Sequence, residues 1–119
     1  MAGILEGKVA LVTGVSADGQ VGQAVAKALG EQGAALIIVA RNEKNVEARA
    51  SELRAGGARI LPLATDLTDE GKVRDGVERA IKEYSRIDIL VNLAGGLTRY
   101  KPAVEHSLDD WMHEMRNNL

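Results

Sequence analysis

The feature that most constrains this chain is the stretch KVALVTGVSADGQVGQAVAKAL at residues 8–29. It reads as a short apolar run, a loop containing Gly14, Gly19 and Gly22, and then apolar residues at helical spacing. Glycines let a backbone approach an anion closely, and the N-terminus of the following helix favours negative charge. The order of strand, glycine loop and helix therefore predicts a parallel α/β sheet that presents a helix N-terminus to a pyrophosphate.

Three further apolar runs predict three more strands. Each is short and bounded by polar or glycine residues, as expected for strands buried on both faces of a parallel sheet. The proline at Pro62 indicates that the third strand lies at or near a sheet edge. The four strands are expected at residues 9–13, 35–40, 59–64 and 87–93.

Helical patterns separate these strands, so we expect right-handed crossovers and helices on both faces of the sheet. Asn42 caps the second helix, Thr68 opens the third, and Ser107-x-x-Asp110 is a capping box for the fourth. The first helix is expected at about residues 20–32, with Val21, Ala24, Val25, Ala28 and Leu29 as its buried stripe. In the third, the buried stripe is Val73, Val77, Ala80, Ile81 and Tyr84.

Composition narrows the class of protein. The 119 residues, 45% apolar and 27% charged, predict one domain spanning residues 1–119. The net charge of −2 gives no reason to expect nucleic acid or an anionic membrane as a partner. Zero cysteines exclude disulfides and thiol catalysis. With no apolar run near the ~18 residues of a membrane span and no signal-like start in MAGILEGK, a cytoplasmic location is expected.

Four ordered segments resemble the short-chain dehydrogenase/reductase family, and the resemblance covers nearly the whole chain. It implies a Rossmann-type parallel sheet with strand order 3-2-1-4, truncated after the fourth strand, and a chain ending within the fourth helix. On this basis the sequence corresponds to roughly the first half of a family member. The segments are Thr13-Gly14 with Gly19 and Gly22, then Asp66-Leu67, then Asn92-Leu93-Ala94-Gly95, and Trp111 with Asn118-Leu119.

The resemblance implies a dinucleotide site. In it Asp66 accepts from the adenine amino group, the Leu67 N–H donates to a ring nitrogen, and Asn92 forms hydrogen bonds across the strand ends. From the residues alone, Asp66 is also suited to capping the turn before Thr68. The implied cofactor-binding residues are Gly14, Ser16, Gly19, Gln20, Val21, Gly22, Arg41, Asp66, Leu67, Asn92, Ala94 and Gly95.

Arg41 bears on the choice between NADP and NAD. An acidic residue at the end of the second strand usually reads the 2′-hydroxyl of NAD, whereas a 2′-phosphate needs a cation. Here the strand is followed by Arg41, whose guanidinium suits a phosphate, and Ser16 offers a hydroxyl. Asp18 argues the other way, because a carboxylate in the loop repels phosphate. We expect NADP(H), with NAD as the alternative.

The glycine loop does not decide between two classes of substrate. Gly14 and Gly22 stand eight positions apart, two more than in the commoner loop of the family. That length resembles the enoyl-thioester reductase branch, in which a small polar residue stands at the place of Gln20. The Asn92 segment and Arg41 resemble the carbonyl-reducing branch instead.

Catalytic residues are mostly missing from the sequence. The family uses a tyrosine as acid/base, a lysine that lowers its pKa, a serine and an asparagine, and only Asn118 matches this set. Tyr84 and Tyr100 are not followed by lysine four places on, so we expect them to pack or lie on the surface. His106 and His113 are expected to be exposed, and no cluster with metal-ligand spacing surrounds them.

Three functions are therefore compared. The first is an oxidoreductase of this family, represented by a cofactor half that is inactive alone and takes a small-molecule substrate only in a complete family member. The second is a noncatalytic dinucleotide-binding module. The third, a mononucleotide domain with a P-loop, is disfavoured by the lack of Gly-Lys-Ser/Thr at residues 19–23. An unpaired apolar fourth strand also predicts a homo-oligomer, formed through that strand edge or the fourth helix.

Overall fold

Residues 3–118, which the computed structural model describes, form a parallel sheet of four strands in the order β3-β2-β1-β4. The expected α/β class, strand order and parallel pairing are confirmed. Met1, Ala2 and Leu119 lie outside the described residues. The strands are β1 (Val9–Thr13), β2 (Ala35–Ala40), β3 (Ile60–Ala64) and β4 (Ile89–Asn92). The helices are α1 (Val21–Glu31), α2 (Glu43–Ala55), α3 (Glu70–Tyr84) and α4 (Leu108–Asn118), with a short 3₁₀ turn η1 (Ala103–Glu105) before α4.

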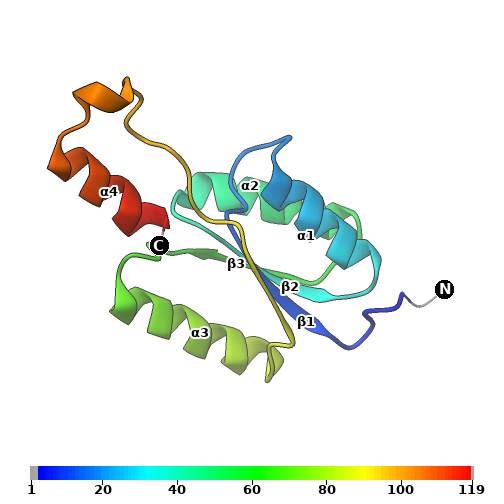
Figure 1. The fold of residues 1–119 in the computed structure, drawn as a ribbon. Helices are drawn as coiled ribbons and strands as arrows, with labels where there is room; N and C mark the ends of the chain where they lie inside the picture. Colours follow the sequence, from blue (N-terminus) through cyan, green and yellow to red (C-terminus); the bar gives the residue numbers. More distant parts are fainter. Residues whose placement is uncertain (1–2, 119) are drawn as a thin grey trace.

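Alternate residues of the central strands divide the core between the two faces of the sheet. On β2, Leu36 and Ile38 pack toward α1 and α2, whereas Ile37 and Val39 face the side covered by α3 (Figure 1). Leu36, Ile37 and Ile38 are fully buried, and each such side chain stabilises the fold by about 1.5–3 kcal/mol. The unbroken apolar run of β2 therefore packs against the helices on both faces of the sheet.

The ends of β4 differ from the sequence expectation of 87–93, and side chains take part in the hydrogen bonds to β1 there. At the start, the Val9 N–H donates to Asp88 Oδ2 at 2.9 Å. At the finish, the Leu93 N–H donates to Thr13 Oγ1 at 3.1 Å rather than to a backbone carbonyl. β3 begins at Ile60, one residue later than expected, and Pro62 lies on this edge strand as predicted.

The predicted buried stripe of α1 is partly wrong. Val21 is 65% exposed, and the helix instead buries Gly22 and Ala26. Gly22 lies directly against the end of β1, so the buried face is centred on Gly22 and Ala26 and excludes Val21. Gln20 is the N-cap residue, and Gln32 the C-cap, so both lie just outside the helix. Ala24 and Ala28 are exposed as well.

The later helices begin at side-chain caps. Asn42 caps α2 as expected, accepting from the Asn45 N–H at 2.9 Å. α3 is capped by Asp69 and not opened by Thr68, because the Thr68 groups bond to Asp66. Its residues Val77 and Ile81 are about two-fifths exposed, contrary to the expected stripe, since α3 meets the sheet through Ala80 and Tyr84.

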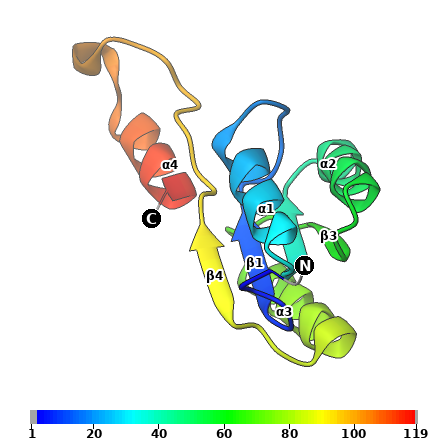
Figure 2. The same cartoon turned by 90° about the vertical axis from the view of Figure 1, so that its right-hand side faces the viewer.

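α4 lies beyond the carboxyl end of β4, beside the sheet rather than over it (Figure 2). The predicted capping box is present: the Asp110 N–H donates to Ser107 Oγ at 3.1 Å, and the Ser107 N–H donates to Asp110 Oδ2 at 3.0 Å. None of the helices within residues 3–118 combines the length and apolar character needed to cross a membrane.

Candidate functional site

Two glycines bring α1 against the end of β1. Gly14 has a φ of +80°, and a Cβ there would lie 2.8 Å from the Leu93 carbonyl. A Cβ on Gly22 would lie 2.1 Å from the Gly14 carbonyl oxygen. Neither position accepts a side chain without movement of backbone, so the two glycines fix how closely the helix N-terminus approaches the strand end.

A cavity of about 420 Å³ opens at the carboxyl ends of the strands, beside this junction. Seven of the predicted cofactor-binding residues line it, from all four strand ends. They are Gly14, Ser16, Arg41, Asp66, Leu67, Ala94 and Gly95. The predicted residues that do not line it are Gly19, Gln20, Val21, Gly22 and Asn92. The rest of the lining consists of Gly96 and of residues that the sequence reasoning missed: Val39, Ala40, Asn42, Thr65, Thr68, Leu97, Thr98 and Asn117.

The first turn of α1 contributes backbone rather than side chains. Gln20 forms no side-chain cap bond, and Val21 is exposed. The α1 N-terminus therefore has N–H groups without a side-chain cap from Gln20, which suits an anion.

Polar groups surround the mouth of the cavity at the end of β2. Arg41 is exposed, and within residues 3–118 no carboxylate lies at ion-pair distance from its guanidinium. Ser16 accepts a hydrogen bond at 3.3 Å from Asn45 Nδ2 on α2. A cation and a hydroxyl are thus both part of the cavity lining.

Asp66 caps the turn before α3, the alternative considered from the sequence. Its Oδ1 accepts from the Thr68 N–H at 2.9 Å and from Thr68 Oγ1 at 2.6 Å. These bonds from Thr68 are the main reason that the pKa of Asp66 lies below its usual value, with smaller contributions from the charges of Lys72 and Arg41. Asp66 is therefore a fixed, ionised carboxylate on the cavity wall.

Thr13, and not Asn92, ties the strand ends together. Thr13 Oγ1 accepts the N–H groups of both Leu93 and Ala94 at 3.1 Å, so it holds the end of β4 against β1. Asn92 is exposed, and no hydrogen bond of its side chain is seen within the described residues. The role expected of Asn92 at the strand ends therefore falls to Thr13. A buried threonine at a strand end beside a glycine is the pattern that points to it.

One face of α4 holds the segment after β4. Asp110, Glu114 and Asn118 are spaced four residues apart and so share this face. Asn118 Oδ1 accepts the Gly96 N–H at 2.8 Å, and its Nδ2 donates to the Gly96 carbonyl at 3.2 Å. The structure thus places Asn118 next to the cavity residues Gly95 and Gly96, although it does not itself line the cavity.

Glu114 and Asp110 were not found from the sequence as parts of this face. Glu114 Oε1 accepts three hydrogen bonds, from Thr98 N–H, Thr98 Oγ1 and Arg99 N–H, at 3.0, 2.7 and 2.8 Å. Asp110 is buried between Lys101 and Arg99, with contacts of 2.7 and 2.9 Å. Hydrogen bonds, above all the one from Thr98, hold the pKa of the Glu114 carboxyl below its usual value. Hydrogen bonds, above all the one from Lys101, do the same for the pKa of Asp110.

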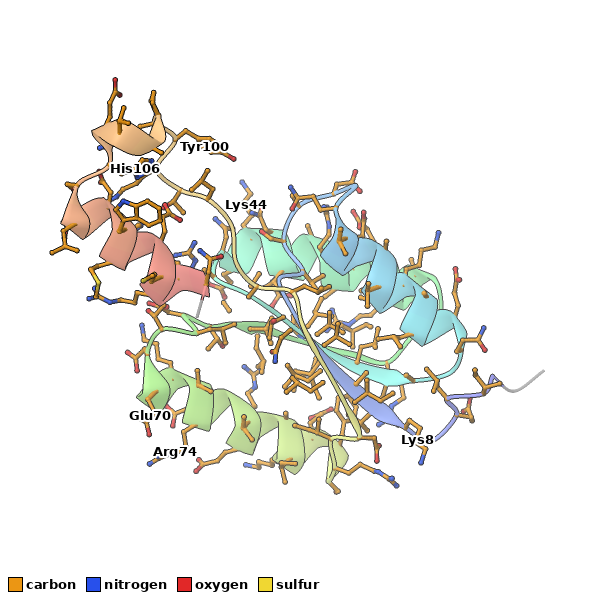
Figure 3. The ribbon with its side chains drawn as sticks, viewed as in Figure 1. Lys8, Lys44, Glu70, Arg74, Tyr100 and His106 are labelled. Carbon is orange, nitrogen blue, oxygen red and sulfur yellow. The ribbon has the colours of Figure 1, made fainter. Side chains whose placement is uncertain are left out.

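The tyrosines and histidines lie outside the cavity. Tyr84 packs under the Arg59 guanidinium at 5.1 Å, and burial raises the pKa of its hydroxyl. Tyr100 is exposed, and it lies with His106 on the segment leading to α4, at the far end of the molecule from Lys8 (Figure 3). The expectation of exposed histidines is wrong, since His106 and His113 are both half-buried. Within residues 3–118 no group of three His, Cys, Asp or Glu side chains is placed to hold a metal ion.

Fold and site together define a class of protein. Open parallel α/β sheets bind ligands in a crevice at the carboxyl ends of their strands, where the strand order reverses. In this chain that reversal falls between β1 and β4, and the cavity lies there beside a glycine loop and a helix N-terminus.

Comparison with known proteins identifies the family within this class. The family model described as short chain dehydrogenase matches residues 8–119, so the chain belongs to the short-chain dehydrogenase family. D-threitol dehydrogenase of Mycolicibacterium smegmatis is 39% identical over 115 residues, which cover 97% of this chain and 43% of the relative.

Solved structures agree. An NAD⁺-bound xylitol dehydrogenase superposes with a TM-score of 0.90 at 28% identity, covering 98% of this chain and 44% of that one. An F189W actinorhodin polyketide ketoreductase with NADPH gives 0.86 at 28%, covering 100% and 44%. The chain thus spans less than half the length of these proteins.

Thr13→Val is expected to loosen the end of β4, because it removes the acceptor of two part-buried hydrogen bonds, from the Leu93 and Ala94 N–H groups. The expected loss in free energy of unfolding is about 1–3 kcal/mol, measured by urea denaturation. Thr13→Ser keeps the hydroxyl and serves as the matched control. Amide exchange at residues 93–94 should quicken only in the valine variant, and equal exchange in both variants would contradict the assignment.

Proposed function

We propose that this chain is the cofactor-binding part of an NADP(H)-dependent oxidoreductase of the short-chain dehydrogenase family. The observation that carries the proposal is the cavity at the strand ends, which joins the glycine junction to the exposed Arg41. Its position, its glycine cradle and its polar mouth suit a dinucleotide.

Each part of the cavity suits one part of the cofactor. Backbone N–H groups between Gly14 and Gly22 would hold the pyrophosphate, with Gln20 and Val21 contributing main chain rather than side chain. Gly19, whose own N–H donates to Gln23 Oε1, would contribute by letting the backbone approach closely. Asp66 and the Leu67 N–H would contact the adenine. Ala94 and Gly95 lack bulk, so a ribose can lie directly against their backbone, with Asn92 just before them at the end of β4.

The choice of NADP over NAD rests on Arg41 and Ser16. Both line the cavity, and the residue after β2 is a cation rather than the carboxylate that reads a 2′-hydroxyl. The similar structures include one protein with NAD⁺ and one with NADPH, so the charge at this position carries the argument. NAD remains the alternative cofactor.

The reaction proposed for the whole protein is hydride transfer between the nicotinamide and a carbonyl or alcohol carbon of a small molecule. When bound, the cofactor supplies the hydride or accepts it. Asn118 would contribute by holding the Gly96 backbone at the cavity rim. The enoyl-thioester alternative rests on the length of the loop from Gly14 to Gly22. A cytoplasmic location remains part of the proposal.

Arg41→Ala is expected to weaken NADPH binding by about ten- to a hundred-fold while changing NADH binding little, because only NADPH presents a phosphate to the guanidinium. Isothermal titration calorimetry with both cofactors measures this. Arg74→Ala on α3, whose side chain pairs with Glu70 on the protein surface, is the control and should change neither affinity. Tighter binding of NADH than NADPH by the unaltered protein would overturn the preference.

Residues 1–119 alone are expected to bind NADPH without oxidising it, because they contain no tyrosine followed by lysine four places on. The measurement is absorbance of NADPH with a panel of ketones. Turnover would show that other residues of the chain supply the acid/base, and it would contradict the proposed division between binding and catalysis. A noncatalytic module would behave in the same way, and a downstream Tyr-x-x-x-Lys in the coding region distinguishes the two.

The chain is expected to self-associate through the β4 edge or the exposed apolar face of α4. β4 ends the sheet, and Leu90 on it is 60% exposed. Trp111, Met112 and Met115 on α4 are each about half exposed. Sedimentation velocity should show a concentration-dependent dimer or larger species, whereas a monodisperse monomer at high concentration would refute this expectation.

A further inference from the structure

The glycine loop contains a carboxylate that the proposed cofactor preference does not explain. Asp18 lies two residues after Ser16, so its α-carbon is at most about 7 Å from that of Ser16. A negative charge this close to the cavity mouth would repel a 2′-phosphate. Yet Asp18 does not line the cavity, whereas Ser16 and Arg41 do.

Gln23, in the first turn of α1, holds this carboxylate. Its Nε2 donates to Asp18 Oδ1 at 2.7 Å, and its Oε1 accepts the Gly19 N–H at 2.6 Å. One side chain therefore binds both the charged group and the backbone of the loop. Gln23 thus ties the glycine loop to α1 at two adjacent loop residues, Asp18 and Gly19.

A second carboxylate completes the bonding of Gln23. Its Nε2 also donates to Glu52 Oε2 on α2, at 2.9 Å. The orientation of the amide is determined by its partners, because an N–H must face an oxygen acceptor and carboxylates accept from an NH₂ group. Both amide hydrogens and the carbonyl of Gln23 are thus in use.

Glu52 is itself held by Arg49. The Arg49 guanidinium pairs with Glu52 Oε1 at 2.8 Å, and the Arg49 side chain is only 12% exposed. Arg49 is one turn before Glu52 on α2, and this helix also bears Asn45, the donor to Ser16. A chain of contacts therefore runs from the buried part of α2 through Glu52 and Gln23 to Asp18.

We infer that Gln23 is a specificity-determining residue, which keeps the Asp18 carboxylate against α1 and so away from the 2′-phosphate of NADP(H) at Ser16 and Arg41. The inference rests on the proposed function. Gln23 touches the loop rather than the phosphate, so it acts through Asp18 and is a positioning residue. Without the amide, the Asp18 side chain is free to turn toward the cavity mouth, where its charge opposes the phosphate but not the 2′-hydroxyl of NADH.

The test compares the affinities for NADPH and NADH in three variants, by isothermal titration calorimetry. Gln23→Met keeps the length of the side chain and removes its hydrogen bonds. It should lower the preference for NADPH over NADH by about three- to ten-fold, the size of effect expected for a carboxylate several ångströms from a phosphate near a protein surface. Gln32→Met, the same change at the other end of α1, is the matched control and should leave the preference unchanged.

The double variant Asp18→Asn with Gln23→Met separates charge from loop structure. Removing the charge should restore the preference, even if both affinities stay weaker because the Gly19 N–H has lost its acceptor. In about 1 M salt the effect of Gln23→Met should vanish, because charges are screened within about 3 Å. Thermal unfolding by circular dichroism verifies that each variant is folded.

The outcomes are distinct. A fall in preference that Asp18→Asn reverses supports the inference, whichever cofactor the unaltered protein prefers. An unchanged preference in Gln23→Met, or equal weakening of both cofactors, overturns it and leaves the proposed function standing. Failure of the unaltered protein to bind either cofactor overturns the proposed function and this inference together.

Discussion

The close approach of the α1 N-terminus to the end of β1 is the constraint on which the rest of the structure depends. A Cβ on Gly22 would lie 2.1 Å from the Gly14 carbonyl oxygen, and a Cβ on Gly14 would strike the backbone at Leu93. Three segments of backbone therefore meet at one point, from β1, α1 and β4. This contact sets the first turn of α1 at the strand ends, close to Gly14, which lines the cavity.

Polar side chains preserve this geometry as the chain leaves the sheet. Thr13 holds the end of β4, Asn118 and Glu114 hold the segment after it, and Gln23 holds the glycine loop. Each tie joins a backbone group of a cavity segment to a side chain of a strand or helix. Most of the cavity wall is loop, yet the groups that position these loops belong to regular elements, which is how a rigid scaffold supports a binding site.

Much of the fold follows from the sequence because buried parallel strands are unbroken apolar runs, as ALIIVA in β2 is. The alternation of strands and helices then predicts a parallel sheet, whereas the strand order is what the resemblance to the family implies. Asn42 and the pair Ser107–Asp110 predict helix caps from residues three apart in the sequence. Val21 and Thr68 were misjudged for a different reason. Helical spacing does not tell which face of α1 packs on the sheet, so the exposure of Val21 was not predicted. Thr68 forms hydrogen bonds with Asp66, so α3 begins later, after its N-cap residue Asp69. The hydrogen bonds from Thr98 to Glu114 and from Gln23 to Glu52 join residues far apart in the sequence, so they leave little trace in local pattern.

The chain belongs to the short-chain dehydrogenase family. We propose that the cavity between the glycine junction and Arg41 holds the dinucleotide. Hydrogen exchange of the backbone amides with and without saturating NADPH tests it most directly. We expect slower exchange at residues 14–22 and 94–96 when NADPH is present. Protection confined to α3 or to the opposite edge of the sheet, or no protection at all despite binding, would contradict the account.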